Sequence, residues 1–385
     1  MIHPGFSQSE YENRVRSLQS RLKSAGCSGA ILTSEANYNY FAGYHHFAPW
    51  STFCRPVFVI IPTEGEPVLV VHEFPLRDAE RDCWFSDVRG YMDLNFAPID
   101  QVTKILIELG MSPGQIGMEL GAEHRMGLTI QEFEALRTQL SPNPLVDIGK
   151  EIWDIRLIKS EAEISLLRES GRIAAQAFDH CFKNIKIGMT EIQASMLLGE
   201  KISQEGGRPG FYIVTSGKGF YDRTAGLPRD RVLQRGDMLW IDLGVVFRGY
   251  WTDHCRAAVI GQASQGQKDN WNAMIKLTRS AVEQVFPDRQ SKDIVQNLEK
   301  NVADAGLRFN FSAGRVGHGI GLMSTEPPHI AKYDDTRFKS GMTFTIEPGW
   351  TDEDLGTFIA EENLVVRDDG PELLTVTPRE LIEIK

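Results

Sequence analysis

The N-terminal part of the chain alternates between helical and strand-like patterns of apolar residues. Residues 11–25 carry apolar side chains at helical spacing and stop at Gly26, which predicts an amphipathic helix. Short apolar runs between turn-forming residues predict three strands, over residues 28–33, 56–61 and 67–71. A second alternation of helix and strand runs from residue 99 to about residue 148. Mixed helices and strands over this length predict a self-contained α/β domain, which we assign to residues 1–152.

The pattern changes after residue 152. Ser160 begins a Ser-x-x-Glu capping box that opens a long amphipathic helix, and a second box at Thr190 opens another helix. From residue 236 onward the patterns are mostly those of strands, with one helix expected between about Gln267 and Ala305. Helices followed by a mainly antiparallel sheet predict an α+β second domain over residues 153–385.

Composition sets the broad class of the protein. Of the 385 residues, 42% are apolar and 24% are charged, which is ordinary for a globular protein. No apolar run approaches the roughly 20 residues that span a bilayer, and the N-terminus lacks the pattern of a standard signal, so we expect a cytoplasmic protein. The net charge of −11 disfavours nucleic acid or an anionic membrane as a partner, because both would repel the protein. The five cysteines are scattered without a Cys-x-x-Cys pair, so we expect buried free thiols.

Two acidic residues interrupt a pair of apolar-rich runs that predict a β-hairpin. Residues 238–247 and 250–255 flank the short turn Arg248-Gly249. With a two-residue loop, Asp242 and Asp253 share one face of the hairpin, either directly opposite each other or on the diagonal. Two carboxylates this close in apolar surroundings repel each other and lose hydration unless a cation lies between them. A solvent-facing pair is the alternative, but the apolar neighbours favour metal ligation.

Three further candidate ligands lie in the C-terminal half. His318 stands in Gly-His-Gly-Ile-Gly, whose small residues leave room for an ion beside the imidazole; a satisfied core histidine is the alternative. Glu347 ends an apolar strand-like run, and Glu361 lies inside the predicted strand 358–366, where an unpaired charge is costly. Two Asp, one His and two Glu have the composition of a divalent metal site, and we expect two metals.

The ordered motifs Asp-(x10)-Asp, His-Gly-x-Gly, Ile-Glu-Pro-Gly and Glu-x-x-Leu-Val-Val resemble those of the pita-bread metallohydrolases, which include methionine aminopeptidase, aminopeptidase P, prolidase and creatinase. Residues 11–150 resemble the N-terminal domain of creatinase and prolidase, and Arg156–Ile164 resemble the segment that opens the catalytic domain. The resemblance implies a C-terminal pita-bread catalytic domain preceded by a smaller α/β domain.

The resemblance also implies roles for the candidate ligands. It implies two divalent metal ions (Mn, Co, Zn or Fe) held by five residues: Asp242 on one metal, His318 and Glu347 on the second, and Asp253 and Glu361 bridging both. The choice of Glu361 over Glu362 follows the spacing to the apolar triplet in the family. A water between the metals would lose its proton near neutral pH and become the nucleophile.

Two histidines that handle protons in the peptidases of this family are missing. Thr224 stands where one is expected, and Thr325 stands where the other would precede Glu326. This departure argues against ordinary cleavage of proline peptides, whereas the metal site is complete. Candidate catalytic replacements are Asp222, Arg223, Glu326 and His329.

The candidate replacements have alternative roles. Arg223 either clamps a substrate carboxylate with two hydrogen bonds or pairs with its neighbour at the surface. His329 either faces the cleft or lies in a solvated turn. Candidates for substrate binding are His46, Tyr212, Trp50 and Phe53, of which the last two line an apolar pocket or belong to the core. His254 points away from Asp253 by strand alternation, so we expect a structural role for it.

These features favour a dinuclear-metal hydrolase that cleaves a C–N bond in a small polar or carboxylate-bearing substrate. The alternatives are an Xaa-Pro dipeptidase in which other groups replace the histidines, a metal-dependent lyase of the dimethylsulfoniopropionate type, and a catalytically silent binding protein. The lyase needs a base next to the substrate, and Glu326 is the one carboxylate of its segment that suggests itself. Silent relatives usually lose metal ligands, and this chain keeps all five.

We expect a homodimer in which the first domain of one subunit caps the catalytic cleft of the other through loop 45–53. Seven aromatic residues within sixteen positions are too many for an exposed loop without a partner surface: Tyr38, Tyr40, Phe41, Tyr44, Phe47, Trp50 and Phe53. Relatives dimerise in this way. The alternative is that the rings pack inside their own domain.

Overall fold

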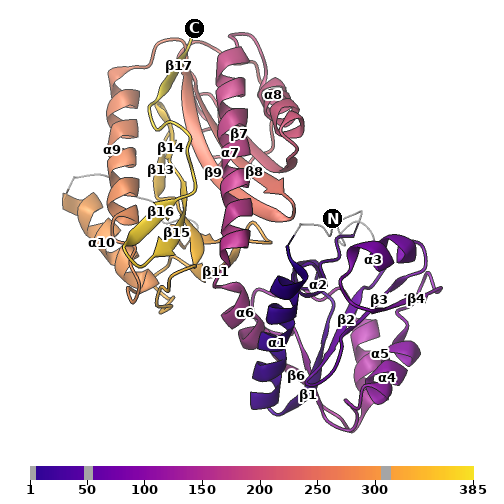
Figure 1. Ribbon diagram of the computed structural model, residues 1–385. Helices are drawn as coiled ribbons and strands as arrows, with labels where there is room; N and C mark the ends of the chain where they lie inside the picture. The colour runs from indigo at the N-terminus through magenta and orange to yellow at the C-terminus, as the bar shows by residue number, and fades with distance from the viewer. Residues whose placement is uncertain (1–5, 47–54, 305–313) are drawn as a thin grey trace. The chain divides into compact units, whose positions relative to one another are not determined.

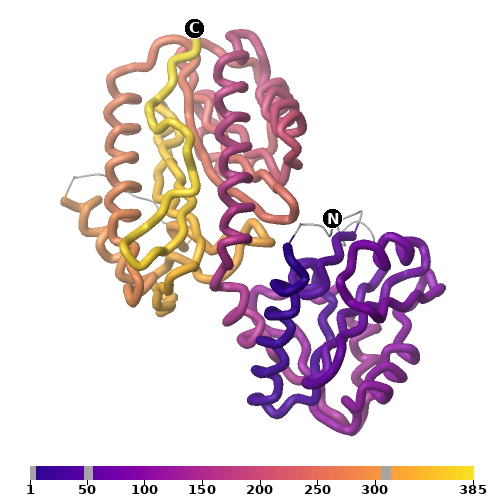
Figure 2. Tube along the Cα trace, in the orientation of Figure 1, coloured from indigo at the N-terminus to yellow at the C-terminus, as the bar shows by residue number. Residues whose placement is uncertain are grey.

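The computed structural model describes residues 6–46, 55–304 and 314–385, which form two compact units (Figures 1 and 2). The first unit ends at Arg156 and the second begins at Leu157. Helix α6 (Gly149–Arg156) runs through residue 152 and closes the first unit.

A six-stranded mixed sheet forms the centre of the first unit, in the order β4-β3-β2-β1-β5-β6. Strand β2 is antiparallel to both of its neighbours, and the other pairs are parallel. The strands are β1 (Cys27–Leu32), β2 (Phe58–Pro62), β3 (Val68–His72), β4 (Asp87–Tyr91), β5 (Gln115–Met118) and β6 (Leu145–Asp147). The remaining helices are α1 (Gln8–Ser24), α2 (Glu35–Ala42), α3 (Leu76–Asp82), α4 (Ile99–Glu108) and α5 (Ile130–Leu140).

Helices cover both faces of this sheet, with α1 on one face and α4 and α5 on the other (Figure 1). Every residue of β2 and β3 is buried, as expected for uninterrupted apolar strands that are covered on both sides. The α/β class predicted for this part of the chain is confirmed. The predicted helix and the three predicted strands are also confirmed, with small shifts at their ends.

The described residues of the second unit form four helices, two larger sheets and one isolated hairpin. The helices are α7 (Glu161–Asn184), α8 (Glu191–Gln204), α9 (Gln265–Val282) and α10 (Ser291–Asp304). The first sheet, in the order β17-β9-β8-β7, contains β7 (Arg208–Ser216), β8 (Met238–Phe247), β9 (Tyr250–Ile260) and β17 (Ile382–Ile384). The second sheet, in the order β11-β10-β12-β15-β16, contains β10 (His318–Gly319), β11 (Glu326–His329), β12 (Thr343–Ile346), β15 (Glu362–Arg367) and β16 (Gly370–Leu373). The isolated hairpin consists of β13 (Gly349–Asp352) and β14 (Gly356–Ile359).

Strand pairing in the second unit is antiparallel except between β17 and β9, which confirms the predicted α+β class. Helices α7 and α8 pack on one face of the β7–β9 sheet, and their shared apolar core includes Phe178, Leu198 and Ile241. The other face of that sheet belongs to a second core, which also contains side chains of α9, α10, β12 and β15. The candidate ligands of the metal site all lie in this second unit.

Local signals in the sequence account for the starts of several helices. Ser160 and Thr190 accept hydrogen bonds from the third residue of α7 and α8 respectively, so both predicted capping boxes are confirmed. The single helix expected between Gln267 and Ala305 is wrong, because two helices occupy this stretch. Residues 283–290 separate them, and there Pro287 cannot continue the helical hydrogen bonds while Asp288 has a φ of 68°. Strand β7 was not anticipated.

Two expectations from composition concern burial and membranes. Among the described residues, no helix is both long enough and apolar enough to cross a membrane. The described cysteines are buried free thiols, as expected: Cys27, Cys83, Cys181 and Cys255.

Candidate metal centre

The hairpin of β8 and β9 positions two of the carboxylates. Phe247 pairs with Tyr250, so the turn has two residues, Arg248 and Gly249, with φ values of 49° and 88°. Positive φ at both positions is typical of the type I′ turn that matches strand twist, and the predicted hairpin is confirmed. Asp242 lies opposite Cys255 and Asp253 lies opposite Gly244, which puts the two acids on the diagonal of one face.

His318 enters the site from β10 as a neutral imidazole with a fixed tautomer. Its Nδ1 lies 3.1 Å from the carbonyl oxygen of Gly319, which only accepts, so Nδ1 carries the proton and donates it. The other ring nitrogen, Nε2, lies 3.6 Å from Asp253 Oδ2 and 3.5 Å from Glu347 Oε1. Burial, and next the charge of Arg315, lowers the pKa of His318 to about 3. An unprotonated Nε2 facing carboxylates is the form that binds a metal.

Glu347 and Glu361 enter the site from the ends of two neighbouring strands, β12 and β15. Glu347 directly follows β12, as predicted, and its backbone N–H donates to the carbonyl oxygen of Val316 at 2.8 Å. Glu361 does not lie inside a strand, which corrects the expectation, because β14 ends at Ile359 and β15 begins at Glu362. Because Glu361 lies between the two strands, the alternation of side chains along a strand does not fix the direction of its side chain. One ligand atom each of Asp253, His318 and Glu361 lies within 4.8 Å of the others.

Several buried carboxylate oxygens in this cluster have no hydrogen-bond partner among the described residues. They are Asp242 Oδ1, Asp253 Oδ1 and Glu361 Oε1. Burial raises the pKa of Asp242 to about 6 and that of Glu347 to about 7. Burial and, next, neighbouring carboxylates raise the pKa values of Asp253 and Glu361 well above their ordinary values. Unpartnered acidic oxygens in a buried group are costly without a cation, so this donor set fits divalent metal ions.

The adjacent residues Glu361 and Glu362 have opposite surroundings. Glu362 Oε1 accepts hydrogen bonds from Arg256 Nη2 at 3.0 Å and Arg379 Nε at 2.8 Å. Its second oxygen accepts from the hydroxyl of Thr375. Both oxygens of Glu362 are therefore occupied by the protein, whereas Glu361 keeps a buried oxygen without a partner. This contrast favours Glu361 as the metal-facing carboxylate, the choice that the family resemblance also gave.

Residues that hold the ligands in place were missed by the sequence analysis. Asn363 Oδ1 accepts from the backbone N–H of Asp253 at 3.1 Å, and its amide nitrogen donates to the Asp253 carbonyl oxygen. The buried Arg256 donates to the carbonyl oxygen of Glu361 at 2.7 Å. Asn363 sits one strand residue past the Glu-Glu pair, so its place in that motif was the available signal. Arg256 had no comparable signal, because the residues next to an arginine in the sequence do not show whether its side chain is buried or exposed.

The glycines around His318 have a packing role that was not expected. A Cβ at Gly317 would overlap the carbonyl oxygen of Thr345, and one at Gly319 would overlap the carbonyl oxygen of Pro327. These glycines let neighbouring backbone segments approach the histidine strand closely. This packing role is additional to the expected one of leaving room for an ion beside the imidazole.

The other candidate catalytic residues have varied surroundings. Glu326 is buried and forms an ion pair with the buried Lys159, with Nζ 3.2 Å from Oε2. Asp222 is exposed. Arg223 is half-buried, and its Nη1 has no hydrogen-bond partner among the described residues. His329 lies on β11 directly opposite His318 and accepts a hydrogen bond from Arg315.

Of the candidate substrate-binding residues, only Tyr212 belongs to the described part of the unit that holds the carboxylates, and it is turned away from them. Tyr212 lies opposite Leu243, on the face of the sheet that packs against α8, whereas Asp242 lies on the other face. His46 belongs to the first unit, where its ring lies 6.3 Å from that of Tyr44. Trp50 and Phe53 lie outside the described residues.

The aromatic segment before Trp50 is largely internal to the first unit. Four of its rings are buried there: Tyr38, Tyr40, Phe41 and Tyr44. These four follow the alternative of packing within their own domain, so they give no support to a capping loop. Phe47, with Trp50 and Phe53, lies outside the described residues. His254 is buried against Phe178, with ring centroids 5.0 Å apart, in agreement with the structural role expected for it.

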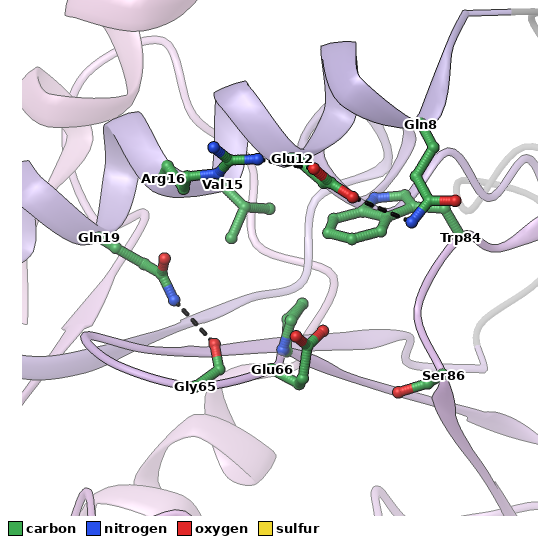
Figure 3. A pocket seen from close by; sticks show the side chains of 10 residues that line it. Gln8, Glu12, Val15, Arg16, Gln19, Gly65, Glu66, Trp84 and Ser86 are labelled. Carbon is green, nitrogen blue, oxygen red and sulfur yellow. Dashed lines mark hydrogen bonds and ion pairs between the residues drawn. The ribbon is translucent and has the colours of Figure 1, made fainter.

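A surface groove of about 540 Å³ in the first unit lies between α1 and the turn after β2 (Figure 3). Gln19 of α1 donates to the carbonyl oxygen of Gly65 at 3.1 Å across it. Arg16 pairs with Glu12 of the same helix at 2.6 Å. None of the predicted site residues lines this groove, so we assign no function to it.

Four carboxylates around a neutral imidazole, two of them buried and two half-buried, are characteristic of divalent-metal hydrolases. Comparison with known proteins agrees with this class: residues 165–368 match the family model of metallopeptidase family M24, and residues 14–158 match that of the creatinase/prolidase N-terminal domain. The chain belongs to metallopeptidase family M24. It is accordingly a metal-dependent hydrolase of the prolidase and creatinase type, in a family whose enzymes use divalent metals.

Individual relatives agree with this assignment. An Xaa-Pro dipeptidase from Pyrococcus horikoshii is 30% identical over 255 residues, which cover 65% of this chain and 71% of the relative. The structure of an Xaa-Pro dipeptidase from Bacillus anthracis aligns with a TM-score of 0.84 at 25% identity, over 97% of this chain and 99% of that one. An X-Pro aminopeptidase from Thermotoga maritima shares the fold, with a TM-score of 0.84 at 23% identity over 96% and 99% of the two chains. The expected pita-bread catalytic domain with a creatinase-type N-terminal domain is thereby confirmed.

Proposed function

We propose that this chain is a dinuclear-metal hydrolase that cleaves the C–N bond of small carboxylate-bearing substrates, with dipeptides as the first class to test. The observation that carries the proposal is a set of buried acidic oxygens, on Asp242, Asp253 and Glu361, that have no partner among the described residues and lie around one neutral histidine. Two of the relatives, from Pyrococcus horikoshii and Bacillus anthracis, are Xaa-Pro dipeptidases, which supports a dipeptide-like substrate.

The proposed ligands are the five residues of the cluster. Asp242, Asp253, His318, Glu347 and Glu361 would together hold the two ions. When bound, two divalent ions polarise the scissile carbonyl and lower the pKa of a water enough to supply the nucleophile near neutral pH. The fixed Nδ1–H donor bond of His318 keeps Nε2 available as a ligand atom.

Proton transfer to the departing nitrogen falls to residues other than the two histidines of the peptidases. Thr224 and Thr325 occupy those places and are weak proton carriers. We propose His329 for contact with the substrate, because it lies directly opposite His318 across β10 and β11. Arg223 is a second candidate, for a substrate carboxylate, because its Nη1 lacks a partner among the described residues.

The test is a metal and substrate survey on chelator-treated protein. Mn²⁺, Co²⁺, Zn²⁺ and Fe²⁺ are added in turn, and release of amino acids is followed for Xaa-Pro dipeptides, other dipeptides and N-acyl amino acids. Asp253→Asn should lose metal and activity together. Asp179→Asn is the matched control, because this exposed carboxylate pairs only with a surface lysine, Lys183, at 2.8 Å among the interactions described. A metal-loaded wild type that hydrolyses no member of the panel would overturn the proposal.

We also propose a homodimer, on the resemblance to relatives alone, now that four of the seven aromatic rings are buried within the first unit. Analytical ultracentrifugation over a range of dilution tests it. A dimer that persists at nanomolar concentration supports the proposal, and a monomer that keeps full activity contradicts it.

A further inference from the structure

Arg315 joins two residues of the neighbouring strand segment. Its Nη1 lies 3.1 Å from His329 Nδ1, and its Nη2 lies 3.4 Å from the hydroxyl oxygen of Thr325. Arg315 stands three positions before His318 in the sequence. Its segment is held beside β11 by two backbone hydrogen bonds: the Val316 N–H donates to the Ile330 carbonyl oxygen at 2.8 Å, and the Ile330 N–H donates to the Gly317 carbonyl oxygen at 2.9 Å.

The contact between Arg315 and His329 fixes the tautomer of the histidine. A guanidinium group has five N–H donors and no acceptor, so Nδ1 of His329 must accept in this bond. In a neutral imidazole the proton then resides on Nε2. Arg315 thus determines that His329 presents an N–H donor from Nε2.

This pair of residues adjoins the proposed metal ligands. His329 and His318 are direct cross-strand partners, and directly opposite residues of an antiparallel pair have their side chains on the same face. The positive charge of Arg315 also acts on three of the ligands. It adds to the lowering of the His318 pKa, and it partly offsets the rise that burial causes in the pKa values of Asp253 and Glu347. These contributions are consistent with a guanidinium beside β10, where Arg315 contacts His329.

We propose that Arg315 is a positioning residue for the reaction. It holds His329 with its proton on Nε2, so that this N–H is directed to the substrate beside the metal ligands. The same guanidinium also holds the hydroxyl group of Thr325. This inference rests on the proposed function. In this chain Thr325 stands in a place where the family's peptidases have a histidine, and the Arg315–His329 pair supplies an imidazole donor from the same strand segment.

The direct test is the tautomer of His329 by nuclear magnetic resonance. Full-length protein labelled with ¹⁵N-histidine is measured with saturating Zn²⁺, and the His329 signals are assigned by their loss in His329→Gln. The expected result is a protonated Nε2 in the wild type and a mixture of tautomers in Arg315→Met, which keeps a similar length without a donor. A protonated Nδ1 in the wild type, or no change in Arg315→Met, would overturn the proposal.

Kinetics give a second readout on the dipeptide that the wild type hydrolyses best. Arg315→Met should lower kcat by about 10-fold or more with little change in KM and in bound metal. Arg315→Lys, which keeps one donor and the charge, should restore part of kcat. Arg279→Met is the control, because Arg279 is exposed on α9 and pairs with Glu283, the residue that directly follows this helix. An Arg315→Met enzyme with kcat within twofold of wild type would contradict the positioning role. A wild type without any dipeptidase activity would contradict the proposed function instead, and the tautomer measurement would then decide whether Arg315 positions His329.

Discussion

Replacing Glu361 or Glu362 with glutamine, one at a time, should change the stability of the metal-free protein in opposite directions. The two residues are neighbours in the sequence and nearly equal in burial, with 1% and 3% of their surface exposed. Glutamine preserves the shape of glutamate and removes its charge. The comparison therefore isolates what each charge does.

The magnitudes follow from the contacts. Glu362→Gln leaves the guanidinium of Arg256, which is 2% exposed, without its charged partner at 3.0 Å, and breaking a buried ion pair in this way costs about 3–5 kcal/mol. Glu361→Gln instead removes a buried carboxylate that has an unpartnered oxygen and a raised pKa. Relief of that desolvation should stabilise the metal-free protein by about 1–3 kcal/mol.

Urea unfolding in the presence of a chelator at pH 7.5 measures the free energy of unfolding of both variants and the wild type. Metal content after reconstitution, measured by mass spectrometry, gives the second half of the contrast: Glu361→Gln should lose metal and Glu362→Gln should retain it. The reasoning is refuted if Glu361→Gln is as destabilised as Glu362→Gln, or if Glu361→Gln binds metal as the wild type does.

Three further predictions concern the same site. The pKa of Asp242 is raised from 3.8 to about 6 and that of Glu347 from 4.5 to about 7. In metal-free protein the folded state therefore binds more protons than the unfolded state in this range, so the free energy of unfolding should fall as pH rises from about 4 to 7.5. Urea unfolding at several pH values, with and without Mn²⁺, should show this fall only without metal. Asn363→Ala removes both hydrogen bonds to the Asp253 backbone and should weaken metal affinity by about 10- to 100-fold in calorimetric titration, and unchanged affinity would contradict that role. Gly317→Ala adds a methyl group that overlaps a backbone carbonyl, so it should lower both the melting temperature and the metal content, and a variant with wild-type values for both would show that the strand can shift at no cost.

Local patterns predicted the elements that depend on nearby residues. The two capping boxes and the β8–β9 hairpin each follow from a few consecutive positions, and parity alone placed Asp242 and Asp253 on one face. The break between α9 and α10 was missed because the helical spacing of apolar residues continues on both sides of Pro287.

Long-range contacts explain what the sequence did not reveal. Tyr212 seemed available as a donor, but the pairing of β7 with β8 turns it toward α8. Arg315 carries no motif, and its relation to His329 and Thr325 exists only because residues 316 and 330 are brought together by strand pairing. The two glutamates 361 and 362 differ only through partners more than ten residues away, such as Arg256 and Thr375. The periodicity and spacing of residues along the sequence do not show which distant segments pair with each other.

The central claim is tested most directly by measuring hydrolytic activity as a function of the number of divalent ions bound per chain. Chelator-treated protein is titrated with Mn²⁺, and free and bound metal are measured at each step alongside the rate on the best dipeptide of the panel. The account predicts no activity without metal and a rate that rises until two ions are bound per chain, with Asp253→Asn inactive throughout. Activity that persists without metal, or two bound ions with no hydrolysis of any dipeptide or acylated amino acid, would contradict it.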